Sequence, residues 1–116
     1  MGGTIQDDKR APVRIQIEYG SGEPFFSAQS LNLSRGGVFL QTEFLLPPGR
    51  AVQLIFNIPA KPRLSVVGRV VWTRGAGDPR GPAGIGIQFE TVAPEVLRVI
   101  EDLLQDQNRT KAPASS

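Results

Sequence analysis

Apolar and polar residues alternate along much of this chain with a period of two, which is typical of half-buried β-strands. The first such run places four apolar residues on one face, namely Val13, Ile15, Ile17 and Tyr19. Similar runs follow at residues 25–33, 38–42, 52–58, 63–73 and 85–89. The alternation therefore predicts six short strands, and in the fifth it places Trp72 on the same face as Leu64 and Val70.

The period changes after Glu90. Pro94 suits the first turn of a helix, and apolar residues then recur at spacings of three and four, which predicts an amphipathic helix over residues 94–106. Gly and Pro residues gather at 75–84, which predicts a hairpin loop. Six strands with tight connections and one helix predict an all-β fold with a C-terminal helix: a closed or nearly closed six-stranded antiparallel β-barrel, one opening of which the helix covers.

The amino-acid composition excludes several classes of function for such a barrel. The 116 residues fit one domain and include no Cys and no His, which excludes disulfides, thiolate nucleophiles, imidazole bases and the usual zinc sites. We therefore expect no enzymatic activity, no catalytic residues, no metal and no cofactor. A net charge of +2 disfavours DNA or RNA as a partner.

The chain also lacks an apolar stretch near the roughly 20 residues that span a bilayer, so we expect a cytoplasmic protein without membrane insertion. Residues 1–8 are predicted to form a flexible N-terminal arm and residues 108–116 a flexible tail.

Two polar segments are candidates for a site. The first holds three cations beside Pro12, namely Lys9, Arg10 and Arg14. The second ends a predicted strand and consists of Asn32, Ser34, Gly36 and Gly37 with their neighbours. Taken singly, the first fits a solvated basic edge and the second an ordinary turn. Taken together, they offer guanidinium forks, an amide, a hydroxyl and approachable backbone N–H groups, a set that suits a guanine nucleotide.

The spacing Arg10-x-x-x-Arg14, followed by Asn32-x-Ser34-x-x-Gly37, resembles the paired RxxxR and (D/N)xSxxG motifs of the bacterial PilZ domain. The match extends over residues 9–107 and includes a late Gly-Ile-Gly strand. PilZ domains are receptors for cyclic di-GMP, so the resemblance implies this ligand as well as a six-stranded barrel with a C-terminal helix.

The resemblance also implies roles for single residues. Arg10 and Arg14 would hold guanine edges and phosphates from the N-terminal arm. A wall on the barrel surface would comprise Asn32, Ser34, Gly36 and Gly37, with Gly86 close to the ligand. Lys9 stands where the family often has Arg, a position linked to whether one ligand or a stacked pair binds. Trp72 is either a stacking platform or a packed core or rim residue, and Arg35 and Arg69 either contact phosphates or face solvent.

The function that follows is binding of cyclic di-GMP without catalysis, with the ordered arm presented to an unidentified effector protein in trans. The exposed helix and strand faces would contact that protein or a second copy in a homodimer. The alternative is a nucleotide-independent PilZ-type adaptor in motility or pilus assembly. The sequence does not choose among motility, polysaccharide export and development as the regulated process.

Overall fold

The computed structural model describes residues 12–114, and beyond Gln105 it describes only the helical backbone. Its strands are β1 (Gln16–Gly20), β2 (Phe26–Leu33), β3 (Gly37–Gln41), β4 (Ala51–Asn57), β5 (Leu64–Arg74) and β6 (Gly84–Thr91), followed by helix α2 (Pro94–Ala114). Each strand lies where the alternation predicts one, with ends that differ by a few residues.

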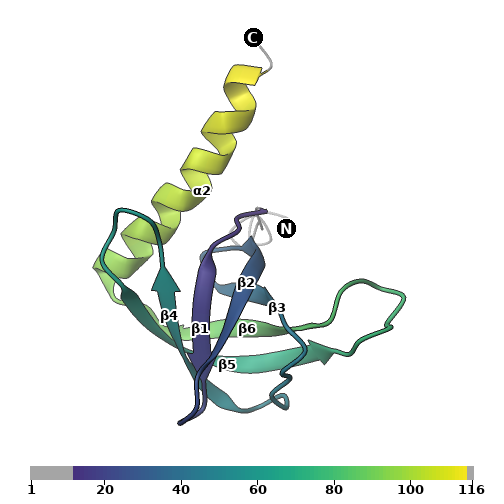
Figure 1. Cartoon of the computed structure of the whole chain (residues 1–116). Helices are drawn as coiled ribbons and strands as arrows, with labels where there is room; N and C mark the ends of the chain where they lie inside the picture. Colours follow the sequence, from purple (N-terminus) through teal and green to yellow (C-terminus); the bar gives the residue numbers. More distant parts are fainter. Residues whose placement is uncertain (1–11, 115–116) are drawn as a thin grey trace, which may run out of the picture.

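The six strands close into an antiparallel barrel in the order β1-β2-β3-β6-β5-β4 (Figure 1). Alternate residues of every strand point inward and fill the barrel. The largest fully buried side chains are Tyr19, Phe56, Ile17, Leu33, Leu40, Leu54, Ile85, Ile87, Ile100, Val38, Val66 and Val70. The predicted fold is therefore confirmed, and side chains on the outer face remain for binding.

Helix α2 is longer than predicted. It runs from Pro94 to Ala114, eight residues beyond the expected end at residue 106, and so takes in most of the predicted tail. Apolar periodicity marks only the turns that pack on the barrel, where Val96 and Ile100 are buried. The residues that follow contain no Gly and include good helix formers, and the backbone stays helical without that periodicity although Pro113 has a low helix propensity. Figure 1 shows the later turns of α2 rising clear of the strands. Over its described residues the helix is not apolar enough to cross a membrane.

Trp72 does not lie on the face that the alternation predicts. The pairing of β5 with β6 shifts between Val70, which is opposite Ile87, and Trp72, which is opposite Gly86. Val71 is the extra residue of this β-bulge. The residues after it therefore point to the opposite face of the sheet from the one that regular alternation predicts. Val70 is buried in the barrel, whereas Trp72 lies on the outer surface and is 37% exposed.

Candidate ligand-binding site

Four residues form a row across the outer surface of the barrel, one from each of four neighbouring strands. Asn32 of β2 is opposite Phe39 of β3, and Phe39 is opposite Gly86 of β6. Gly86 is in turn opposite Trp72 of β5. Strand pairing thus brings an amide, two aromatic rings and a glycine together from distant parts of the sequence.

Gly86 allows the indole of Trp72 to lie flat on the barrel. A β-carbon at residue 86 would lie 2.4 Å from Cε2 and from Nε1 of the indole, closer than atoms can approach. With glycine there, the indole crosses β6 and stacks on Phe39, with ring centroids 5.0 Å apart and planes 14° from parallel. We call Phe39 and Trp72 the aromatic platform.

Arg74 extends over this platform. Its Cζ atom is 5.1 Å from the ring centroid of Phe39 and 5.0 Å from that of Trp72, so both contacts are within cation–π range. Its Nη1 donates a hydrogen bond to the carbonyl oxygen of Pro82, which lies in the β5–β6 loop (3.3 Å). The loop therefore helps to hold the guanidinium beside the rings.

A cavity of about 340 Å³ opens at this place, and we call it the platform cavity. Its lining residues are Leu31, Asn32, Phe39, Trp72, Arg74 and Pro82. Aromatic faces bind flat bases, a guanidinium binds phosphates and the edges of guanine, and an amide both donates and accepts hydrogen bonds. The lining suits a purine nucleotide.

The motif turn, residues 34–37, follows Asn32 and is closed by its own hydrogen bonds. The N–H of Ser34 donates to the carbonyl of Gly37 (2.9 Å), and the N–H of Gly36 donates to Oγ of Ser34 (3.2 Å). The Ser34 hydroxyl also donates to the Gly37 carbonyl (3.4 Å), and Ser34 is 1% exposed. In the structure described, the hydroxyl that was expected to meet a ligand shapes the turn.

Gly37 and Gly36 tie this turn to β6. A β-carbon at residue 37 would lie 2.4 Å from the carbonyl oxygen of Ile87, so the close approach of two strands requires glycine at this position. The carbonyl of Gly36 accepts a hydrogen bond from the N–H of Phe89 (2.8 Å). These contacts are structural, and the ligand contacts expected of both glycines stay a prediction.

Arg14 is exposed, and its two neighbours are fixed to β2 by Ser30. The Ser30 hydroxyl donates to the carbonyl of Val13 (2.6 Å) and accepts from the N–H of Ile15 (2.9 Å). The backbone N–H of Ser30 also donates to the carbonyl of Ile15 (3.0 Å). The backbone on both sides of Arg14 is therefore fixed to Ser30, which lies two residues before Asn32 in β2. Lys9, Arg10 and the predicted arm at 1–8 lie outside the described residues.

Comparison with known proteins agrees with this architecture. The PilZ domain family matches residues 5–106, which is most of the chain. The chain belongs to the PilZ domain family. Among curated proteins no sequence matches it.

Several solved structures have the same fold. The PilZ domain of YcgR from Escherichia coli, determined with c-di-GMP, superposes with a TM-score of 0.69 at 14% identity over 93% of this chain and 95% of that one. MrkH of K. pneumonia in complex with c-di-GMP gives 0.71 at 16% identity, covering 94% and 54%. The Bacillus subtilis inhibitor of motility MotI/DgrA gives 0.72 at 15%, covering 86% and 50%. The chain thus spans about half the length of the latter two.

Other charged groups of this PilZ barrel are paired with one another. Arg69 donates to Glu90 (2.7 Å) and to the carbonyl of Gly49 (2.8 Å). In the β5–β6 loop, hydrogen bonds from the side chain and backbone of Arg80 hold the pKa of the Asp78 carboxyl well below its usual range. The carboxylate in turn raises the pKa of Arg80. Within the described part of the chain, no three acidic side chains gather as a metal site.

Sequence reasoning missed four of the residues at the platform cavity, namely Leu31, Phe39, Arg74 and Pro82. The alternation places Phe39 on the outer face of its strand, where nothing distinguishes it from other outward-facing residues. Arg74 and Pro82 lie beside and within the segment that the sequence predicts as a hairpin loop. One signal was present, because Gly84 and Gly86 alternate on β6 and such glycines in a strand often mark a close approach. The partner that approaches, Trp72, became visible only with the strand pairing.

Proposed function

We propose that this PilZ domain is a receptor for cyclic di-GMP without catalytic activity, and that it binds the nucleotide on the outer surface formed by β2, β3, β6 and the end of β5. The observation that carries the proposal is the platform cavity, where Asn32 lies beside stacked Phe39 and Trp72 under the guanidinium of Arg74. Aromatic, amide and cationic groups here match the base, the base edge and the phosphates of the ligand.

The two motifs would complete the site. Arg14, exposed and anchored through Ser30, would donate its guanidinium fork to a guanine edge or a phosphate. Arg10, four positions earlier in the sequence, would add a second fork. Asn32 would hydrogen-bond a guanine edge. Ser34, Gly36 and Gly37 would contribute by shaping the motif turn that follows Asn32. Gly86 would contribute by leaving the space that the indole of Trp72 occupies. Lys9 would bear on whether one or two ligands bind.

Complexes of related folds support this ligand. The PilZ domain of YcgR and the MrkH protein were both determined with c-di-GMP, and each covers more than nine tenths of this chain. In the present chain, ligand binding would order the segment that contains Arg10 and present it to an effector protein in trans.

Calorimetric titration with cyclic di-GMP tests the proposal. The wild-type protein is expected to bind with micromolar or better affinity. Arg14→Ala, Arg10→Ala and Asn32→Ala should each weaken binding by about 5- to 150-fold, which corresponds to roughly 1–3 kcal/mol for a good bidentate contact.

Arg63→Ala is the matched control. It also removes an exposed guanidinium, but one that pairs with Glu18 (3.8 Å) and takes no part in the proposed site, so binding should be unchanged. No detectable binding by the wild-type protein would reject the proposal and favour a nucleotide-independent adaptor.

A further inference from the structure

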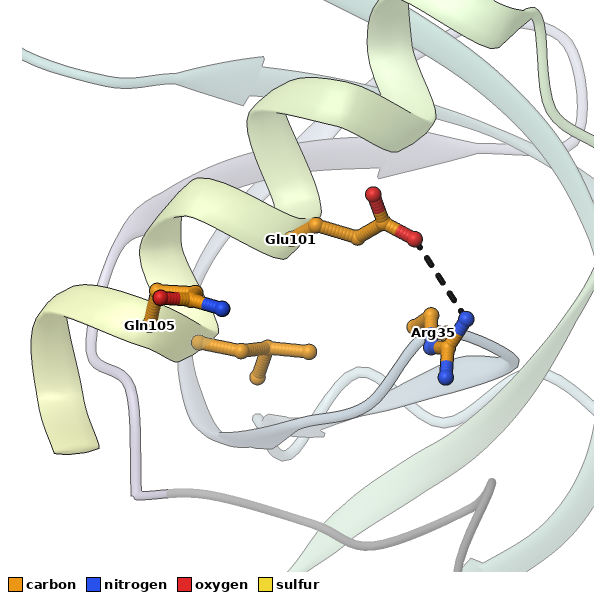
Figure 2. A pocket seen from close by; sticks show the side chains of 4 residues that line it. Arg35, Glu101 and Gln105 are labelled. Carbon is orange, nitrogen blue, oxygen red and sulfur yellow. Dashed lines mark hydrogen bonds and ion pairs between the residues drawn. The ribbon is translucent and has the colours of Figure 1, made fainter.

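Arg74 differs from several other arginines of the barrel in what it contacts. Four arginines of the described residues pair with carboxylates, namely Arg35 with Glu101, Arg63 with Glu18, Arg69 with Glu90 and Arg80 with Asp78. Figure 2 shows the first of these pairs, in which the two side chains point toward each other. Among the described side chains, Arg74 forms no ion pair, and its contacts are two aromatic rings and one carbonyl oxygen. Its charge is therefore not neutralised by a direct ion pair within this part of the chain.

The Arg74 guanidinium is held at the platform with two of its nitrogens unbonded to the described residues. Nη1 donates to the carbonyl oxygen of Pro82 (3.3 Å), whereas neither Nε nor Nη2 donates to any residue that the structure describes. Contacts of Cζ with the rings of Phe39 (5.1 Å) and Trp72 (5.0 Å) hold the planar group. Nε and Nη2 carry the two parallel N–H groups with which an arginine binds a phosphate side-on.

Gly81 leaves the space in which this guanidinium lies. A β-carbon at residue 81 would lie 2.5 Å from Nη1 and 3.4 Å from Cζ of Arg74. The next residue, Pro82, supplies the carbonyl that accepts from Nη1. Two consecutive residues of the β5–β6 loop therefore determine where the end of the Arg74 side chain lies.

Hydrogen bonds hold the loop that carries these two residues. The Asp78 carboxylate accepts from the backbone N–H (2.8 Å), Nε (3.0 Å) and Nη2 (2.7 Å) of Arg80. The N–H of Gly81 donates to the carbonyl of Asp78 (3.2 Å). After Pro82, the carbonyl of Ala83 accepts from the N–H of Thr42 (3.1 Å) and ties the loop to the segment that follows β3. The loop therefore supports Arg74 with a defined backbone conformation.

We propose that Arg74 binds a phosphate of the ligand side-on through Nε and Nη2, and that Gly81 and Pro82 are positioning residues for this contact. This role rests on the function proposed above and gives the β5–β6 loop a part in recognition that neither motif covers. Cζ of Arg74 is only 5.0 Å from the ring centroid of Trp72. Because only the sugar separates a base from its phosphate, a base stacked on the indole would bring a phosphate close to the guanidinium.

Calorimetric titration with cyclic di-GMP at several salt concentrations tests the phosphate contact. Arg74→Ala should bind about 10- to 150-fold more weakly than the wild type, the effect of losing a charge-assisted pair of hydrogen bonds. Its affinity should also fall less steeply as salt is added, because one contact between a cation and a phosphate is gone. Arg74→Lys should bind with intermediate affinity and keep the wild-type salt dependence. Wild-type affinity or wild-type salt dependence in Arg74→Ala would overturn the contact.

A second set of variants tests the positioning role. Gly81→Ala should displace the guanidinium and weaken binding by about two- to tenfold. In the Arg74→Lys background the same change should cause no further loss, because lysine has neither Nη1 nor Cζ. Gly77→Ala is the matched control, since φ is positive at both Gly77 (85°) and Gly81 (156°) but a β-carbon at residue 77 meets nothing within 4 Å. Gly77→Ala should bind with wild-type affinity.

Two results would overturn the positioning role. One is an equal loss of affinity in Gly77→Ala and Gly81→Ala, and the other is the same loss from Gly81→Ala with arginine and with lysine at residue 74. Either result leaves the proposed function standing. Absence of binding by the wild-type protein would instead reject the function and, with it, this role of Arg74.

Discussion

The indole ring of Trp72 occupies the space that a side chain at Gly86 would need. The two residues are paired across β5 and β6, and a β-carbon on residue 86 would come within 2.4 Å of the ring. Because glycine leaves that space open, Trp72 reaches across β6 to Phe39, and Arg74 reaches both rings. The aromatic platform therefore depends on one missing side chain.

Gly86→Ala should displace the indole without unfolding the barrel. Trp72 is the only tryptophan of the chain, so its fluorescence reports the change directly. In the ligand-free variant we expect emission at longer wavelength, because the displaced indole is more exposed to water. We also expect weaker binding of cyclic di-GMP.

Gly75→Ala is the control for that change. A β-carbon at residue 75 meets nothing within 4 Å, so both the emission and the affinity should match the wild type. The combination of Gly86→Ala with Trp72→Ala should bind no more weakly than Trp72→Ala alone. A further loss in the double variant would show that Gly86 acts by another route.

Trp72→Ala should weaken cyclic di-GMP binding by about 5- to 150-fold, the effect of losing roughly 1–3 kcal/mol of stacking on one base. In the wild type, ligand should quench the Trp72 emission as the base covers the ring. Val71→Ala, which alters the exposed neighbouring residue of the bulge, should bind normally. Wild-type affinity in Trp72→Ala would remove the platform from the site.

The barrel could be predicted from the sequence because each strand buries alternate residues. Apolar residues therefore occupy alternate positions in the strand segments between Val13 and Phe89. The face of Trp72 could not be predicted. A bulge at Val71 adds one residue, and nothing in the run Val70-Val71-Trp72 shows which residue is extra. The motif residues were found from their spacing, whereas Phe39 and Arg74 join the site only through the pairing of β3, β6 and β5.

Ser30 should be important for stability, because its hydroxyl is buried and bonded at both ends. Ser30→Ala removes the acceptor of the Ile15 N–H and the donor to the Val13 carbonyl. The expected loss of unfolding free energy in urea denaturation is about 1–3 kcal/mol. Ser65→Ala, whose hydroxyl only accepts from exposed Gln53, should change it by less than about 0.5 kcal/mol. Equal effects of the two variants would mean that the Ser30 bonds do not anchor the segment around Arg14.

Tyr19 should destabilise the fold at high pH. Burial raises the pKa of its phenol above the ordinary value near 10, partly offset by the hydrogen bond with Thr42 (2.8 Å). The folded state therefore holds this proton more tightly than the unfolded state does. The resulting stability is complete below pH 10 and is lost as the pH rises through the raised value.

Tyr19 is the only tyrosine, so phenolate absorbance follows its titration without interference. The folded protein should titrate above the pKa of the urea-unfolded protein. In Tyr19→Phe the unfolding free energy should fall less steeply as the pH rises, because the variant has no phenol to titrate. Coincident titration curves for folded and unfolded protein would contradict the prediction.

An amide NMR titration of the wild-type protein with cyclic di-GMP shows most directly whether the ligand binds at the platform cavity. Saturable shifts are expected for the Trp72 indole N–H and for the backbone amides of Arg14, Asn32 and Phe39, while the amide signal of Gln53 on the outer face of β4 should not shift. Absence of shifts at millimolar ligand, or shifts confined to other surfaces of the barrel, would contradict binding at the platform cavity.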